Sequence, residues 1–274
     1  MNILDKIVEN KKKEIENSKF KTSIKHLEQT VFFSRKTVSL CTNIKQQNST
    51  GIIAEFKRKS PSKGIINDTF SALDVVRQYE KAGVSGSSIL TDEVFFGGTQ
   101  QDLISVRDEI KLPLLRKDFM IDEYQFVEAK SIGADVVLLI ASILTPQQVK
   151  QFTDLSHQLG LEVLLELHDE SELHHVYHAV DLVGINNRNL KTFEVDIEQS
   201  IRMAEKLGDS FVKVAVLKFV AAPKVPLAEP NKIETLLLLK QNGFQGFLIG
   251  ENFMKSENPG IACEEFIRAI RNAR

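Results

Sequence analysis

Eight short apolar runs, each followed by an amphipathic segment, occupy the chain from Gly51 onward. The runs are GIIAEF, GSSIL, LPLLRK, DVVLLI, LEVLLEL, DLVGIN, FVKVAVL and GFLIG, beginning near residues 51, 86, 112, 135, 161, 181, 211 and 246. Helical segments follow them over roughly 68–82, 99–109, 123–132, 146–159, 170–179, 196–207, 231–241 and 263–272. Continuous apolar strands that alternate with helices are typical of a parallel sheet with both faces covered.

Eight strand–helix units in about 220 residues fit a closed (β/α)8 barrel, or TIM barrel, better than an open doubly wound sheet. The open sheet stays an alternative, but no G-x-G-x-x-G opens a helix after a strand, so neither NAD nor FAD is predicted. We interpret residues 51–274 as a (β/α)8 catalytic domain and residues 1–50 as an N-terminal helical extension packed on it. In that extension Ile3, Ile7 and Ile15 form one apolar helical stripe.

Composition argues against several classes of protein. A formal net charge of −2 gives no preference for nucleic acid or an anionic membrane. The sequence also lacks an 18-residue apolar stretch of the kind that spans a bilayer. The N-terminus has scattered charges and no apolar core of a signal peptide. Cys41 and Cys263 are interpreted as free thiols in a reducing cytoplasm. We therefore expect a cytoplasmic monomer without nucleic-acid or membrane partners.

Polar residues stand where the predicted strands end, which is where a (β/α)8 barrel forms its active site. The first run leads to Glu55, Lys57 and Ser60, the third to Lys117, the fifth to Glu166, and the sixth to Asn186 and Arg188. Since side chains alternate along a strand, two lysines and two glutamates are expected to converge at one mouth. Coupled charges in such a cavity can transfer protons. A single lysine or glutamate at a strand end is more often a solvated residue on the rim of the barrel. Four such residues at matching heights on different strands favour an active site.

The eighth run offers a second signal. It ends in Gly250 and Glu251 before a short helical turn, and backbone N–H groups of such a turn bind phosphate. Phe96 and Phe119, just past the second and third strands, either wall an apolar slot for a flat ring or pack under the loops. Glu162 shares the face of Glu166 but lies deeper, where we expect an ion pair or a polar layer.

Four of the six histidines lie in HDESELHHVYH, with His174 and His178 at i, i+4 on the helix predicted over 170–179. That spacing can bind zinc. However, no acid lies between the two, no third ligand is evident, and the helix follows a strand on the outside of the barrel. No metal site is predicted.

Seven motifs in order resemble one family, indole-3-glycerol-phosphate synthase. They are IIAEFKRKSPSKG, SILTDEVFFGG, LPLLRKDFMID, GADVVLLIASIL, LEVLLELH, VGINNRNLKTF and GFLIGENFMK. The resemblance covers nearly the whole chain, including the N-terminal extension. It implies conversion of 1-(2-carboxyphenylamino)-1-deoxyribulose 5-phosphate into indole-3-glycerol phosphate, CO2 and water, in tryptophan biosynthesis and without a cofactor.

The resemblance also implies roles for the strand-end residues. Lys117 is expected to be the general acid, Lys57 to hold the substrate carboxylate and assist dehydration, and Glu166 to support Lys117 or act as a base. Glu55 and Asn186 would orient hydroxyls and relay protons. Ser60 and Arg188 would bind substrate, Gly250 and Glu251 would bind phosphate, and Phe96 and Phe119 would wall the anthranilate pocket.

The seventh strand departs from the family pattern. Val216, Leu217 and Lys218 stand where Glu, Ser and Gly are expected, and the segment 216–230 is longer than usual. The expected glutamate contacts substrate, and the Ser-Gly backbone helps to hold phosphate. Glu229 is the one carboxylate that the longer loop could return to the site. The activity could therefore be reduced.

Two other functions stay open. One is a Schiff-base aldolase on the same barrel that uses Lys57, Lys117 or Lys218 as the nucleophile. The other is a catalytically silent barrel that binds phosphates or a partner, suggested by the altered seventh strand.

Overall fold

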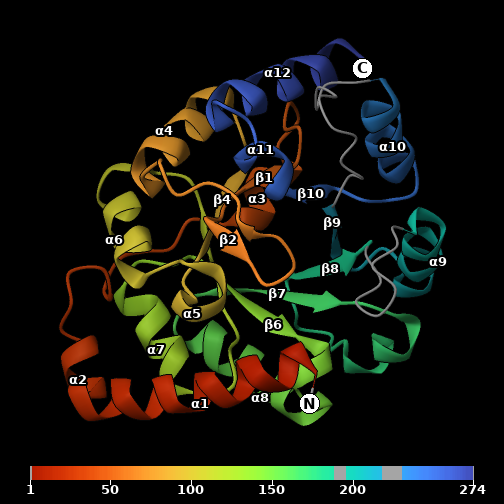
Figure 1. Ribbon diagram of the computed structural model, residues 1–274. Coiled ribbons are helices and arrows are strands. Elements are labelled where there is room, and N and C mark those ends of the chain that lie inside the picture. The colour runs from red at the N-terminus through yellow and green to blue at the C-terminus, as the bar shows by residue number, and fades with distance from the viewer. Residues whose placement is uncertain (1, 188–195, 218–229, 274) are drawn as a thin grey trace.

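Eight parallel strands close into a barrel at the centre of the computed structural model, which describes residues 2–187, 196–217 and 230–273 (Figure 1). The strands are β1 (Ile52–Phe56), β4 (Gly86–Leu90), β5 (Leu114–Lys117), β6 (Val136–Ile140), β7 (Glu162–Leu167), β8 (Leu182–Asn186), β9 (Val212–Leu217) and β10 (Gly246–Ile249). Because β10 returns to pair with β1, the order β1-β10-β9-β8-β7-β6-β5-β4 is closed. The eight predicted strands and the predicted closed barrel are confirmed.

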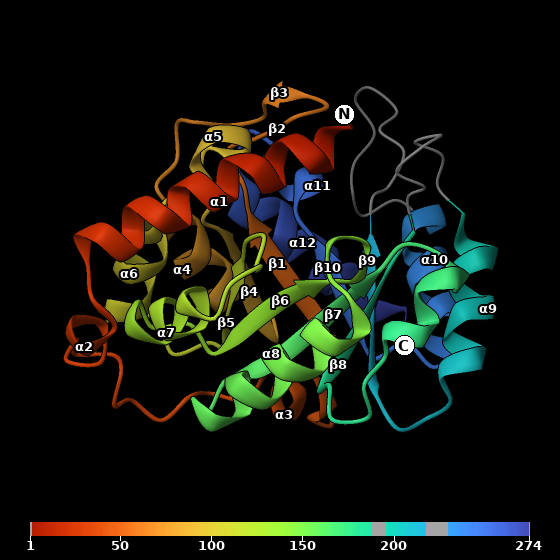
Figure 2. The same cartoon turned by 90° about the horizontal axis from the view of Figure 1, so that it is seen from below.

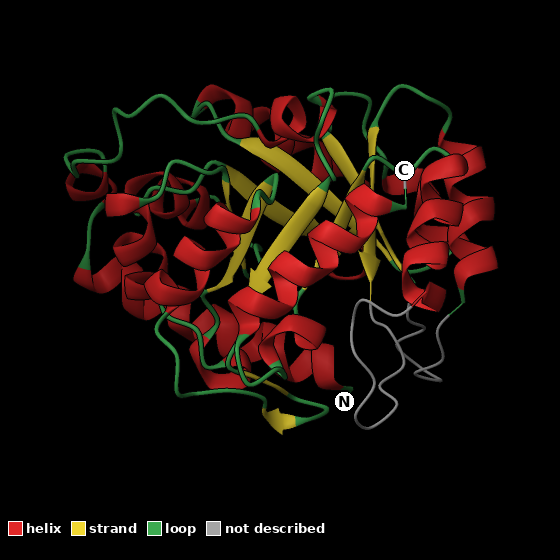
Figure 3. Cartoon of the chain, turned by 90° about the horizontal axis from the view of Figure 1, so that it is seen from above, coloured by secondary structure: helices red, strands yellow, loops and turns green. Residues whose placement is uncertain are grey.

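Helices surround the barrel (Figure 3). Those that follow the strands along the chain are α4 (Ala72–Ala82), α6 (Gln100–Glu109), α7 (Tyr124–Ser131), α8 (Pro146–Gln158), α9 (Ile197–Leu207), α10 (Pro230–Gln241) and α12 (Pro259–Asn272). Local signals set their ends: Ser71 caps α4 by accepting the backbone N–H of Asp74, and Gly83 stops it at φ 87°. None of the helices in these described ranges is long and apolar enough to cross a membrane.

The helix predicted over 170–179 is wrong. In its place lies the short 3-10 helix η2 (Glu170–His175). The side chain of Asp169 accepts the N–H of Ser171, and the Glu172 carboxylate turns back to the N–H of His168, so local side-chain contacts replace the α-helical ladder. Other short elements after the strands are η1 (Ala141–Ile143), α5 (Glu93–Phe96) and α11 (Glu251–Met254).

The strands alternate between two apolar layers. Ile52, Ala54 and Phe56 of β1 belong to the layer between the barrel and its helices, whereas Ile53 belongs to the apolar filling of the barrel. This period-two alternation points Glu55 inward, at the carboxyl end of the strand. The sequence thus positions a charged side chain above an apolar barrel core.

The first fifty residues cover both ends of the barrel. Helix α1 (Ile3–Lys21) lies at the carboxyl end of the strands, the same end as the hairpin β2 (Lys59–Ser60) and β3 (Gly64–Ile65), and the short α2 (Ile24–Leu27) follows it (Figure 2). At the other end, α3 (Leu40–Lys45) inserts Leu40 and Ile44 into the apolar filling. Glu162 accepts the backbone N–H groups of Leu40 and Cys41 at 2.7 and 3.2 Å. The expected polar group near the barrel bottom therefore anchors α3.

Candidate active site

Strand β1 delivers an acid and a base to the mouth of the barrel. Glu55 is its penultimate residue and Lys57 follows its end, so both side chains point to the same side. Lys57 Nζ lies 2.8 Å from Glu55 Oε1, and both residues are buried. A buried pair of this kind holds each partner in one position, because leaving either charge unpaired is costly.

Strands β5, β7 and β8 bring three further polar side chains to the same mouth. Lys117 Nζ lies 2.9 Å from Glu166 Oε2 and 4.0 Å from Glu55 Oε2. Asn186 Nδ2 donates to Glu166 Oε1 at 3.1 Å. Glu55, Lys57, Lys117, Glu166 and Asn186 thus form one group, here called the charged cluster, in which positive and negative groups alternate.

The charged cluster shifts the protonation of its members. Burial alone would lower the pKa of Lys117, but the carboxylates of Glu166 and Glu55 raise it above its ordinary value. Burial alone would raise the pKa of Glu166, but Lys117 and His168 hold it well below its ordinary range. At neutral pH Lys117 is therefore a charged ammonium beside an ionised Glu166, an arrangement suited to delivering a proton.

Ser60, Phe96 and Phe119 follow the carboxyl ends of β1, β4 and β5, the end of the barrel at which the cluster lies. The Oγ of Ser60 is buried and has no hydrogen-bond partner within the described ranges. The rings of Phe96 and Phe119 are 5.9 Å apart and inclined by 38°. Together with Leu4 and Ile7 of α1 they belong to the apolar filling of the barrel. Arg188, also named from the sequence, lies outside the described residues.

Gly250 lies directly against the charged cluster. A Cβ atom at this position would come within 2.4 Å of Glu55 Oε1 and 2.7 Å of Glu55 Cβ, so only glycine leaves room for the carboxylate. Glu251 begins α11 and forms an i, i+4 ion pair with Lys255. The strand-end turn predicted from the sequence is therefore adjacent to Glu55.

The altered seventh strand presents apolar side chains. Val216 is buried in the barrel filling opposite Asn186 in the register of β8 and β9, and Leu217 faces the outer apolar layer. Lys218 and Glu229 lie outside the described residues. Within the described ranges, β9 thus contributes an apolar wall beside Asn186 where the family resemblance leads one to expect a carboxylate.

Two features of the site were not predicted. His168, two residues beyond Glu166, places Nε2 3.3 Å from Glu166 Oε1. Its signal was in the sequence, because Glu55 and Lys57 have the same i, i+2 spacing.

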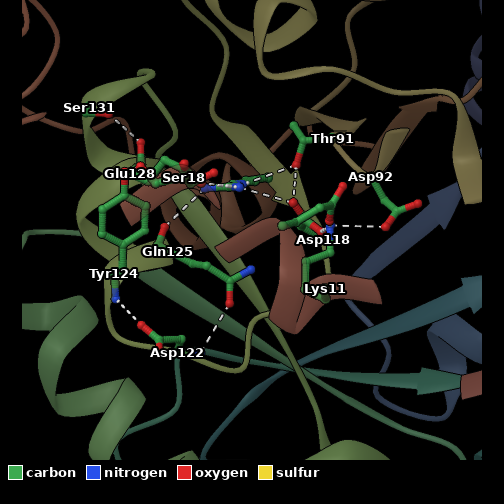
Figure 4. Close-up of polar contacts among 12 residues, drawn as sticks. Lys11, Ser18, Thr91, Asp92, Asp118, Asp122, Tyr124, Gln125, Glu128 and Ser131 are labelled. Carbon is green, nitrogen blue, oxygen red and sulfur yellow. Dashed lines mark hydrogen bonds and ion pairs between the residues drawn. The ribbon is translucent and has the colours of Figure 1, made fainter. Parts of the chain in front are cut away.

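The second is Lys11, a buried lysine in the middle of α1 (Figure 4). Its Nζ lies 3.0 Å from Asp92 Oδ2 and 2.8 Å from Asp118 Oδ1, and Asp118 Oδ2 in turn lies 3.1 Å from Arg116 Nη2. We call these four residues the Lys11 network. Burial alone would raise the pKa of Asp118, but Lys11 and Arg116 hold it below its ordinary range. Because Arg116 and Asp118 flank Lys117, the network ties α1 to the strand end that carries that lysine.

A cavity of about 390 Å³ lies beneath α1, outside the barrel mouth. Its walls include the buried charges of Lys11, Arg116, Asp118 and Glu128, which pair with one another. Paired charges on the outer side of β5 offer no group that is poised to react. We therefore place the chemistry in the charged cluster.

The histidine-rich segment forms no metal site in the described part of the chain, where no group of three or more His, Cys, Asp or Glu side chains could hold an ion. His174 and His178 do not share an α-helix, because η2 ends at His175. The Nδ1 atom of His174 instead contacts the backbone oxygen of Ser171 at 2.5 Å.

The barrel and its charged mouth are typical of an acid–base enzyme of the (β/α)8 class. The profile of the family described as "Indole-3-glycerol phosphate synthase" matches residues 4–266. A protein of that name from Bacteroides thetaiotaomicron is 42% identical over 269 residues, covering 98% of this chain and 99% of that protein. Another, from Campylobacter fetus, is 39% identical and covers 93% of this chain and 95% of its own. The chain belongs to the indole-3-glycerol phosphate synthase family, decarboxylating lyases of tryptophan biosynthesis that act on a phosphorylated small molecule.

Solved structures with the same fold are much more distant in sequence. The tryptophan synthase alpha chain from Legionella pneumophila superposes with a TM-score of 0.59 at 10% identity, covering 85% of this chain and 96% of that one. The 3-hexulose-6-phosphate synthase from Salmonella typhimurium gives 0.61 at 9% identity, covering 82% and 100%. These likenesses support the barrel fold alone.

Proposed function

We propose that the charged cluster carries out the ring closure of this family on 1-(2-carboxyphenylamino)-1-deoxyribulose 5-phosphate, releasing CO2 and water. The observation that carries the proposal is the position of Lys117, whose Nζ lies between the carboxylates of Glu166 and Glu55 at 2.9 and 4.0 Å. An ammonium group held in this way is a proton donor that faces the open end of the barrel.

Lys117 would protonate the carbonyl oxygen of the substrate while the aryl carbon attacks the carbonyl carbon. Negative charge develops on that oxygen and positive charge on the ring, so fixed charges of both signs lower the barrier. Glu166, an anion whose pKa lies well below its ordinary range, would balance the ring cation or accept its proton. Lys57, paired with Glu55, would hold the substrate carboxylate and assist the later loss of water.

The remaining residues would hold the substrate. Within the described ranges the Oγ of Ser60 has no hydrogen-bond partner, so it is available to the substrate. The neighbouring rings of Phe96 and Phe119 suit the flat face of the anthranilate group. Gly250 and Glu251 would bind the phosphate through the backbone after β10, and Arg188 would contact the substrate.

The apolar end of β9 is expected to reduce the rate. Val216 places a hydrocarbon group beside Asn186, so a substrate hydroxyl at that position gains no carboxylate partner from β9. The test compares the chain with a variant carrying Val216→Glu, Leu217→Ser and Lys218→Gly. Substrate is added and the rise of indole fluorescence is followed. We expect turnover by both proteins and a higher kcat for the variant.

The other two functions, an aldolase and a silent barrel, predict different results. An aldolase needs a lysine of lowered pKa, whereas the pKa of Lys117 is raised, which favours the acid role. Borohydride reduction in the presence of a ketose phosphate would trap a covalent adduct on an aldolase and none on the synthase. Substrate binding without any fluorescence gain would instead support a silent barrel.

We also propose that the chain works in the cytoplasm as a monomer. The thiols of Cys41 and Cys263 are both free, which supports a reducing compartment. Size-exclusion chromatography with light scattering measures the mass directly: a value near 31 kDa supports a monomer, since one chain weighs 30.9 kDa.

A further inference from the structure

His168 lies between two carboxylates at the edge of the charged cluster. It follows Leu167, the last residue of β7, and its Nε2 lies 3.3 Å from Glu166 Oε1. On its other side, Nδ1 lies 3.7 Å from Oε2 of Glu172, a residue of η2. The same Glu172 oxygen accepts the backbone N–H of His168 at 2.6 Å, which ties η2 to the strand end.

The Glu166 carboxylate consequently has a different set of partners on each oxygen. Oε2 faces Lys117 at 2.9 Å, while Oε1 faces both Asn186 and His168, at 3.1 and 3.3 Å. Lys117 and Asn186 face the mouth, where substrate would bind and could displace them. His168 approaches from the side of η2 and is only 10% exposed.

We propose that His168 is a positioning residue. In its cationic form it holds Oε1 of Glu166 in place when Lys117 turns to the substrate. This proposal rests on the proposed role of Glu166 in ring closure. As Lys117 gives up its proton it becomes neutral, and Glu166 would lose its nearest counter-charge. The imidazolium of His168 replaces that charge, so Glu166 stays ionised and correctly oriented for the ring cation or its proton.

The charges around His168 support its cationic form. Glu166 faces it from β7 and Glu172 from η2, while Asn186 on β8 is uncharged, and Lys117 on β5 reaches the other oxygen of Glu166. Burial alone would lower the pKa of His168, but the contact with Glu166 and the negative charges of Glu166 and Glu172 raise it to about 9. The imidazole is therefore a cation at neutral pH.

Two substitutions separate the hydrogen bond of His168 from its charge. His168→Gln keeps a donor but removes the cation, so the acidic limb of kcat/KM, which reports Glu166, moves up by about one pH unit. His168→Leu removes both and lowers kcat by about tenfold or more, with KM changed less than about threefold. The exposed His26→Gln is the matched control and changes neither. Thermal unfolding verifies that the variants are folded.

A second measurement does not depend on turnover. The imidazole signals of the six histidines are titrated by NMR, with His168 assigned from its absence in His168→Gln. We expect His168 to titrate near 9 in the unchanged protein, and about one unit or more lower in Glu166→Gln and in Glu172→Gln.

The two measurements distinguish a failure of this proposal from a failure of the proposed function. If the unchanged protein makes no indole product, the proposed function fails, and the NMR coupling alone decides whether His168 holds Glu166. If His168 titrates near its ordinary value in all three proteins, the positioning role is overturned. Unchanged kcat and pH profile in His168→Leu would overturn it as well.

Discussion

Replacing Lys11 by methionine tests how α1 is held on the barrel. Methionine keeps most of the length and the apolar stem of lysine but removes the charge. Lys11 and Asp92 are 4% and 0% exposed, so the substitution leaves a buried carboxylate without its ion-pair partner. Breaking a buried pair in this way costs about 3–5 kcal/mol.

The structure places Lys11→Met at the lower end of that range. Asp118 keeps Arg116 Nη2 at 3.1 Å, Thr91 Oγ1 at 2.7 Å and the backbone N–H of Phe119 at 2.8 Å. Asp92 keeps only the backbone N–H of Phe95, at 2.8 Å, among the contacts recorded in the described ranges. We therefore expect the free energy of unfolding to fall by about 3 kcal/mol, which is a shift of about 1 M in the urea midpoint.

The assay is urea unfolding followed by far-UV circular dichroism, because the chain contains no tryptophan. Lys12→Met, at the exposed neighbouring position, is the matched control and should change the free energy by less than about 0.5 kcal/mol. Adding Asp92→Asn to Lys11→Met removes the stranded charge but preserves an N-cap acceptor, and should restore part of the loss. Equal midpoints for Lys11→Met and Lys12→Met would refute the reasoning.

Two further predictions concern the mouth. Gly250→Ala would bring a Cβ within 2.4 Å of Glu55 Oε1, so we expect the Lys57–Glu55 pair to be displaced. The value of kcat/KM, measured by product fluorescence, should then fall by about tenfold or more. An unchanged kcat/KM would mean that Glu55 is not held by this contact. The stability that His168 contributes is fully present below its ordinary pKa of 6.5 and is lost as pH rises through about 9. Between pH 6 and 9.5 the unchanged protein should therefore lose roughly 2–4 kcal/mol more than His168→Gln, judged from urea midpoints at both pH values; parallel losses would contradict the shift.

Periodicity explains why much of the architecture was predictable. Side chains alternate along a strand, so the sequence predicts that Glu55 and Lys57 share a face, as do Leu115 and Lys117. The closed barrel is predicted from the number of strands, which is eight. The inward direction of Glu166 was predictable for the same reason. His168 obeys the same i, i+2 rule, but the histidine-rich segment that follows it obscures this signal in the sequence.

Other features depend on contacts between distant segments. Lys11 looks like one of many charges on α1, and only the folded chain brings it to Asp92 and Asp118. The absence of an α-helix after β7 reflects the Glu172 carboxylate binding the N–H of His168, a contact that propensity alone does not predict. Ile3, assigned to the apolar stripe of α1, is 48% exposed because it lies at the very start of the helix.

The most direct test of the account is the rate of indole formation by Lys117→Ala beside the unchanged protein and Lys150→Ala, an exposed lysine on α8. With no tryptophan in the chain, product fluorescence rises over a low background. Loss of the general acid should lower kcat by at least about a hundredfold, while Lys150→Ala stays near the unchanged rate. A Lys117→Ala rate close to that of the unchanged protein would contradict the claim that the ammonium between Glu166 and Glu55 drives the reaction.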